Sequence, residues 1–169
     1  MNLGTKKYPS GVVIIMGVSG TGKSTVGKLL ADKLKIPFFD ADDFHPRENI
    51  EKMQHGEPLT DEDRKPWLEH LAKEIEKWRS QDGAVLACSA LKQKYRILLQ
   101  GRDQAPITWV HLIGDAKTIF DRMQGRKDHF MPESLLQSQL DTLEPPANAI
   151  EVEINQSPEK MVVQIMHHL

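Results

Sequence analysis

The first segment of the chain with a clear chemical meaning is GVSGTGKS at residues 17–24, which fits G-x-x-x-x-G-K-S at every fixed position. Its glycines let the backbone turn so that several N–H groups point at one spot, where a side chain would block a phosphate. A helix that begins here adds unpaired N–H donors and the positive end of its dipole. The segment therefore predicts binding of ATP or another nucleoside triphosphate together with Mg²⁺.

Two side chains in this segment have distinct expected roles. Lys23 is expected to bridge the β- and γ-phosphates, and the Ser24 hydroxyl is expected to ligate Mg²⁺. A chance glycine turn between a strand and a helix is the alternative, but it rarely reproduces the whole pattern. The pattern does not reveal whether water or a second substrate receives the phosphoryl group. The residues predicted to contact the nucleotide are Gly17, Val18, Ser19, Gly20, Thr21, Gly22, Lys23, Ser24 and Thr25.

A second cluster of functional groups is the acidic run DADD at residues 40–43. Three carboxylates this close repel one another unless a cation lies nearby, and magnesium on the triphosphate would supply it. We assign Asp40 to the metal and Asp42 to the acceptor hydroxyl, which it would orient and deprotonate. A solvated acidic turn or a helix cap is the alternative, and for Asp43 it is as good an explanation.

Basic residues follow the acidic run and predict a pocket for an anionic acceptor. An unpaired carboxylate is costly to bury, and the planar fork of arginine matches it best. Each of these cations taken alone is as often a surface charge. Their bunching at one predicted edge of a sheet favours binding. The predicted acceptor-binding residues are Asp40, Asp42, His45, Arg47, Arg64, Lys92 and Arg96.

A further basic cluster, nearer the carboxyl terminus, predicts a lid over about residues 122–142. A phosphotransferase must exclude water, and cations on a mobile cover would neutralise charge on the transferring group. We expect Arg126 to act in catalysis and Arg122 to contact the nucleotide; Lys127 and His129 lie beside them. The alternative is a basic helix end that complements the helix dipole.

The pattern of apolar residues indicates how these groups are brought together. Short apolar runs alternate with helical patterns, which predicts an α/β fold with right-handed crossovers and a parallel sheet. Ligands of such sheets bind beyond the carboxyl ends of the strands. Expected helices begin near Lys23, at Thr60, after Asp115, at Pro132 and after Ser157. Expected strands cover 12–16, 37–40, 84–87, 108–113 and 151–154.

Length and composition indicate a single domain over 1–169, with a flexible tail at 1–10. The net charge of −2 argues against nucleic acid and anionic membranes as partners. One cysteine, Cys88, excludes an internal disulfide, and no apolar run could span a bilayer. With no signal-peptide pattern at the amino terminus, we expect a cytoplasmic protein.

Taken together, four segments resemble the gluconokinase family, thermoresistant type. They are GVSGTGKST at 17–25, DADDFHPRENIEKMQHGEPLTDEDRKPWL at 40–68, ACSALKQKYR at 87–96 and RKDHFMPESLLQSQLDTLEPP at 126–146. The first occurs in a very large superfamily, whereas the second and third are far more specific. One departure is Ala41, where the family often has glycine between two aspartates.

The resemblance implies a three-layer P-loop fold like those of nucleoside-monophosphate and shikimate kinases, with a five-stranded parallel sheet, helices on both faces and a lid. It implies transfer of phosphate from ATP to D-gluconate, a small-molecule substrate, and a homodimer. Another small-metabolite kinase, shikimate-like or nucleotide-specific, remains the alternative within kinases. An ATP-binding switch without an acceptor is the alternative outside them.

Overall fold

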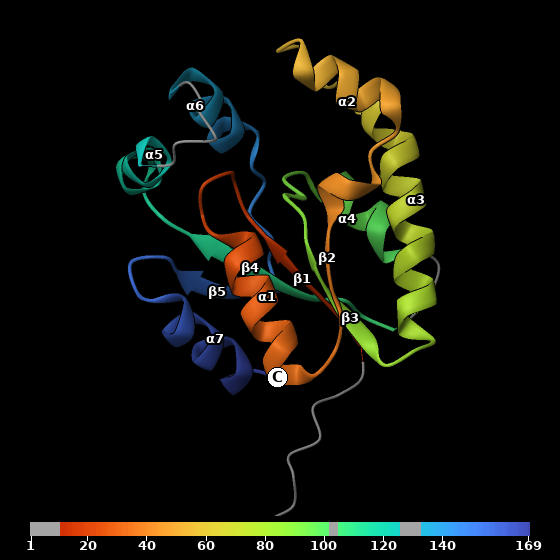
Figure 1. The fold of residues 1–169 in the computed structure, drawn as a ribbon, viewed down its shortest axis with the longest axis vertical. Helices are drawn as coiled ribbons and strands as arrows, with labels where there is room; N and C mark the ends of the chain where they lie inside the picture. Colours follow the sequence, from red (N-terminus) through yellow and green to blue (C-terminus); the bar gives the residue numbers. More distant parts are fainter. Residues whose placement is uncertain (1–10, 102–104, 126–132) are drawn as a thin grey trace, which may run out of the picture.

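A five-stranded parallel sheet forms the centre of the computed structural model, which describes residues 11–101, 105–125 and 133–169. The strand order is β2-β3-β1-β4-β5, so the strand that precedes the glycine-rich loop is central (Figure 1). Every expected strand is present, with ends shifted by no more than one residue. The strands are β1 (Gly11–Met16), β2 (Phe38–Asp40), β3 (Gly83–Ala87), β4 (Thr108–Ile113) and β5 (Ile150–Glu153).

Helices cover both faces of the sheet, which confirms the predicted three-layer α/β fold (Figure 1). Val13 and Ile15 of β1 pack on the side of α1 and α7, while Ile14 packs on the side of α3 and α4. Burying an isoleucine side chain of this kind contributes about 1.5–3 kcal/mol. The helices are α1 (Lys23–Leu34), α2 (Arg47–Gln54), α3 (Asp61–Arg79), α4 (Gln93–Gln100), α5 (Ala116–Gln124), α6 (Glu133–Thr142) and α7 (Pro158–His167).

Side chains at helix starts fix where the helices begin. Thr60 and Asp63 form a reciprocal capping box at the start of α3, as their spacing predicts. Asp115 accepts a hydrogen bond of 2.7 Å from the Thr118 N–H and caps α5. Each cap satisfies N–H groups that have no partner within the helix.

Three helical segments have no counterpart among the sequence-based expectations, namely α4 and the two segments that follow β2. The 3₁₀ helix η1 (Ala41–Phe44) and α2 follow β2 directly and stand above the sheet edge (Figure 1). Periodicity does not reveal α2 because its apolar residues, Ile50 and Met53, are more than 40% exposed. The segment is therefore a wall over the ligand-binding edge and contributes little to the core.

Two expectations fall on residues outside those described, namely the tail at 1–10 and the part of the lid at 126–132. Within the described ranges, no helix is both long and apolar enough to cross a bilayer.

Candidate active site

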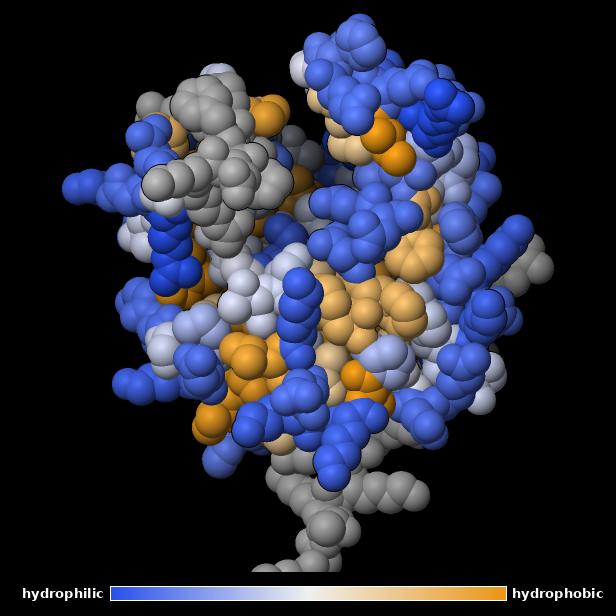
Figure 2. Space-filling view, in the orientation of Figure 1, coloured by the Kyte–Doolittle hydropathy of each residue, from blue (hydrophilic) through white to orange (hydrophobic). Residues whose placement is uncertain are grey.

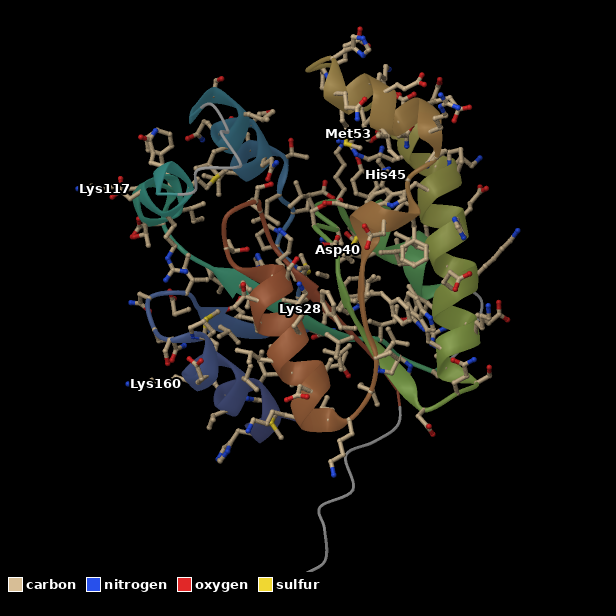
Figure 3. All side chains as sticks on the ribbon, viewed as in Figure 1. Lys28, Asp40, His45, Met53, Lys117 and Lys160 are labelled. Carbon is tan, nitrogen blue, oxygen red and sulfur yellow. The ribbon has the colours of Figure 1, made fainter. Side chains whose placement is uncertain are left out.

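A cavity of about 900 Å³ lies at the carboxyl ends of the strands. It separates α2 from the side of α5 and α6, and Figure 2 shows the surface hollowed there. Residues 17–25, here called the nucleotide wall, line one side, and residues 41–67, the acceptor wall, line another. Asp40, His45 and Met53 follow one another along the acceptor side in Figure 3. The cavity thus joins the segments that the sequence marks as functional.

The nucleotide wall depends on backbone conformations that favour glycine. Gly22 caps α1 with φ 89°, and Gly20 has φ 84°. A Cβ atom on Gly20 would lie 2.6 Å from Cγ of Met123. The Lys23 ammonium donates to the Val18 carbonyl at 3.0 Å, which keeps it beside the loop. The wall therefore has the turn and the positive charge that phosphate binding requires.

Ser24 and Asp40, the two predicted magnesium ligands, lie side by side. The Ser24 hydroxyl donates to Oδ2 of Asp40 at 3.1 Å, although the residues come from different elements. Oδ1 of Asp40 accepts from the Asp42 N–H at 3.0 Å and caps η1. Asp40 is thus a helix cap and a metal candidate at once. Two hard oxygen donors fit Mg²⁺, which takes few protein ligands beside phosphates and water.

Asp42 stands at the cavity with its side chain 84% accessible to solvent. Loss of hydration among the surrounding cavity walls, and then the nearby Asp40 carboxylate, raise its pKa, while Lys23 opposes the shift. Because water still reaches the carboxylate in this open cavity, we expect a modest shift. A raised pKa suits a group that accepts a proton from a hydroxyl.

His45 is held by an aromatic neighbour on the acceptor wall. Its ring stacks on Trp67 with centroids 4.1 Å apart, and its side chain is 4% exposed. Burial, and then the charge of Arg64, lower its pKa to about 4. Nε2 lies 3.9 Å from Oδ1 of Asp42. His45 is therefore a neutral hydrogen-bonding group at neutral pH.

Arg64 is the predicted acceptor cation that the structure brings to the cavity. It comes from the first turns of α3, and its side chain is 31% exposed. Nη1 donates to the Tyr95 hydroxyl at 3.3 Å and lies 3.9 Å from Oδ1 of Asp61. These neighbours hold a guanidinium in a position where it can bind a carboxylate.

Three other predicted acceptor residues do not line the cavity. Arg47 projects from α2, 88% exposed, and pairs with Glu51. Lys92 bonds to Asp61 at 3.3 Å, outside the cavity. The sequence places both near the expected ligand-binding edge, but it does not show in which direction either side chain points.

Arg96 also differs from its expectation, for a physical reason. Its guanidinium is buried and donates at 2.7 Å to the carbonyls of Ala90 and Glu144. Ala90 has φ 44°, a strained conformation for a residue with a side chain, in the loop that forms the cavity floor. Arg96 thus stabilises this loop from behind.

The described part of the predicted lid consists of the end of α5 and α6. Arg122 donates to the Ile154 carbonyl at the end of β5, beyond the cavity lining. Arg126 lies outside the described residues. From α6, Gln139 accepts from the Ser19 N–H at 2.8 Å and donates to the Ser19 hydroxyl at 3.1 Å. The α6 helix therefore contacts the nucleotide wall directly.

Sequence reasoning missed several residues of the cavity. Gln139, Trp67 and Cys88 all line it. Trp67 belongs to an apolar helical pattern that indicates core, and Gln139 carries no signal of its own. Burial raises the pKa of the Cys88 thiol to about 12, so it is not a nucleophile at neutral pH.

Comparison with known proteins fits this arrangement. The profile of the shikimate kinase family matches residues 19–169, so the chain belongs to that broad P-loop family. A gluconokinase of Gluconobacter oxydans is 45% identical over 92% of this chain and 89% of its own. The thermoresistant gluconokinase of Escherichia coli is 40% identical over 95% of this chain and 94% of its own. The chain belongs to the gluconokinase family.

A solved structure supports the same membership. The crystal structure of a gluconokinase from Sinorhizobium meliloti matches with a TM-score of 0.85 at 40% identity, and covers 94% of this chain and 90% of that one. The shared fold therefore extends over nearly the whole length of the chain.

Proposed function

We infer that this protein is a gluconokinase, which transfers the γ-phosphate of ATP to D-gluconate and yields 6-phospho-D-gluconate and ADP. One observation carries the inference: the glycine-rich loop, a strand-end carboxylate pair and a half-buried arginine line one cavity. The relatives named gluconokinase support D-gluconate as the acceptor. A sugar acid offers both groups that such a cavity suits, a hydroxyl and a carboxylate.

The nucleotide wall would bind the triphosphate. Backbone N–H groups between Gly17 and Thr25 and the start of α1 suit the β-phosphate. Lys23 would leave the Val18 carbonyl and bind the γ-phosphate. Arg122 and Arg126 remain proposed lid cations, acting on nucleotide and transition state when the lid closes.

We propose Mg²⁺ as the accompanying metal, held by Ser24 and Asp40. The contact between their side chains, 3.1 Å apart, supports this choice. When bound, the ion would neutralise charge on the phosphates. Such a metal also explains why two carboxylates tolerate each other at this strand end.

The acceptor would lie between Asp42 and Arg64. The oxygen of the acceptor hydroxyl would form a bond to the γ-phosphorus, and Asp42 would accept the proton that this hydroxyl loses. The bond between that phosphorus and the bridging oxygen then breaks, and ADP leaves with the electron pair. Arg64 would bind the carboxylate, and His45 a nearby oxygen. Arg47, Lys92 and Arg96 would enter only if closure moved them.

The alternative within kinases is a shikimate-like or nucleotide-specific enzyme, which the broad family match also allows. The likeness of the whole chain to gluconokinases favours gluconate. We further propose a homodimer, as the resemblance implies, and a cytoplasmic location.

The deciding experiment measures ADP release by the purified full chain with ATP and Mg²⁺. The acceptors are D-gluconate, its epimers, shikimate, nucleoside monophosphates and none. We expect turnover with D-gluconate and very little without an acceptor. Equal ADP release with and without every acceptor would indicate an ATPase or a switch, and faster turnover with shikimate or a nucleotide would support the alternative.

A further inference from the structure

We propose that Asn49 is a positioning residue that holds His45 as the neutral tautomer protonated at Nε2, so that His45 presents one uncharged N–H donor to the acceptor. The role of that donor rests on the proposed function. The tautomer itself does not, and it can be measured without any substrate.

The orientation of the Asn49 amide is fixed by a carbonyl. Its Nδ2 lies 2.9 Å from the backbone oxygen of Asp63, which can only accept a hydrogen bond. The same nitrogen lies 3.2 Å from Nδ1 of His45. An exchange of the amide O and N would put two carbonyl oxygens in contact. Nδ2 is therefore the donor to both, and Nδ1 of His45 is an acceptor without a proton.

The surroundings of His45 prevent the ring from turning to another partner. Trp67 stacks against it with 16° between the planes and is itself fixed by donating from Nε1 to the Ala41 carbonyl at 2.7 Å. Asn49 is 3% exposed, so water does not replace its bond to the ring. With Nδ1 committed to Asn49, Nε2 carries the proton and faces Asp42.

Burial and the charge of Arg64 favour a neutral ring and outweigh the Asp42 carboxylate, which on its own would favour protonation. Asp42 of η1 lies on the Nε2 side, and the charge of Arg64 from α3 disfavours protonation. The nearby pair of Lys52 and Asp63, 2.7 Å apart, lies behind Asn49. The ring keeps one donor over the neutral pH range. Arg64 then supplies the positive charge in the pocket and His45 a directional hydrogen bond.

The direct test is the tautomer, read from long-range ¹H–¹⁵N spectra of the full chain labelled in histidine. His45 is assigned by its missing signals in His45→Gln. We expect the Nε2–H form at pH 7. In Asn49→Asp, the new carboxylate accepts from Nδ1, so the ring changes tautomer or gains a second proton with a raised pKa. Asn148→Asp, the same change at an exposed turn before β5, leaves the spectrum of His45 unchanged.

An Nδ1–H form in the unaltered protein, or an unchanged Nε2–H form in Asn49→Asp, would overturn the proposal. Should Asn49→Asp not fold, Asn49→Ala serves instead. It removes the donor without adding charge, so His45 becomes a mixture of both tautomers. A pure Nε2–H form in Asn49→Ala would also overturn the proposal.

A double-mutant cycle separates positioning from packing. Where the spectra show that Asn49→Asp moves the proton from Nε2 to Nδ1, the Nε2–H donor is lost, and kcat/KM for D-gluconate is expected to fall about tenfold, as the loss of one directed hydrogen bond would. In a His45→Gln background, which has an amide and no tautomers, the same change should cost much less. If the losses in kcat/KM from Asn49→Asp and His45→Gln simply add in the double variant, Asn49 does not act through His45, and only its bond to the Asp63 carbonyl matters. That result would overturn the proposal. If no variant phosphorylates gluconate, the proposed function fails, while the spectra still decide the tautomer.

Discussion

The nucleotide wall is held by backbone conformation, whereas the acceptor wall is held by side chains of one helix that bond to the backbone of another. Gly20 and Gly22 take conformations that few other residues tolerate, and the loop continues directly from the central strand into α1. On the other side, Asn49 joins α2 to α3, and Trp67 joins α3 to η1. The nucleotide wall is thus specified by one short segment, and the acceptor wall by residues spread over about one turn each of three helices.

This difference predicts different consequences of mutation. In the nucleotide wall, a change to a side chain outside the core, such as Lys23, should affect chemistry with little effect on stability, because the backbone carries the structure. Changes in the acceptor wall should affect acceptor binding and helix docking in proportions that depend on which contact is lost.

The largest effect is expected for Lys23→Ala. Removing the ammonium deprives the γ-phosphate of its positive partner, and kcat should fall by about 10²–10³-fold. The melting temperature should stay nearly unchanged, since Lys23 lies at the first position of α1 and outside both core clusters. A coupled ADP-release assay and thermal melts measure the two quantities. Normal turnover would remove Lys23 from its proposed role.

Arg64→Leu tests the acceptor wall. Loss of a charge-assisted hydrogen bond to a carboxylate should raise KM for D-gluconate about 10–100-fold, with KM for ATP little changed. Arg64→Lys is the matched control, which keeps the charge without the planar fork and should recover part of the loss. A parallel rise of both KM values would contradict the assignment of Arg64 to the acceptor.

Arg96→Met should behave in the opposite way, although Arg96 lies on the neighbouring helix. It leaves the Ala90 and Glu144 carbonyls without their donor, at a cost of about 1–3 kcal/mol in the free energy of unfolding. Urea unfolding measures this loss. We expect both KM values to move together, if at all, since the floor of the cavity serves both substrates. A rise of KM for gluconate alone would instead support a role of Arg96 in binding the acceptor.

The smallest effect concerns the pair of Lys52 and Asp63. The hydrogen bond from Lys52, and then one with Thr60, lower the Asp63 pKa from its usual 3.8 to about 2. A lowered folded-state pKa gives stability that is present above pH 3.8 and lost as the pH falls toward 2. Lys52→Met should therefore lower the melting temperature slightly at pH 6, and the difference from the unaltered protein should shrink at pH 2–3. A difference independent of pH would show that packing, not charge, is lost.

The same contrast explains how far the sequence could predict the molecule. The five strands and the nucleotide wall were predictable, because β-branched runs and a contiguous glycine pattern are local signals. That Ser24 and Asp40 lie close together was also predictable, because the ends of parallel strands meet at one edge of the sheet. Those contacts depend on topology and need no detail of side-chain direction.

The acceptor wall was predictable only in part. The positions of Asp42, His45 and Arg64 agree with their expected place at the cavity, and their roles remain predictions. Arg96 and Arg64 are equally basic in sequence, and the buried carbonyls of Ala90 and Glu144, which the sequence does not reveal, explain why Arg96 turns away from the cavity. Asn49 could not be recognised at all, because its significance lies in which atom of His45 it meets.

The contact of Gly20 with Met123 connects the phosphate-binding turn to α5, the helix that precedes the proposed cover. Since the space beside Gly20 is filled by the methionine thioether, the turn cannot shift toward α5 unless that side chain moves first. A tilt of α5 would in turn press on the turn or leave it unsupported. We therefore expect a displacement of α5 to reach the phosphate-binding turn through the Met123 side chain.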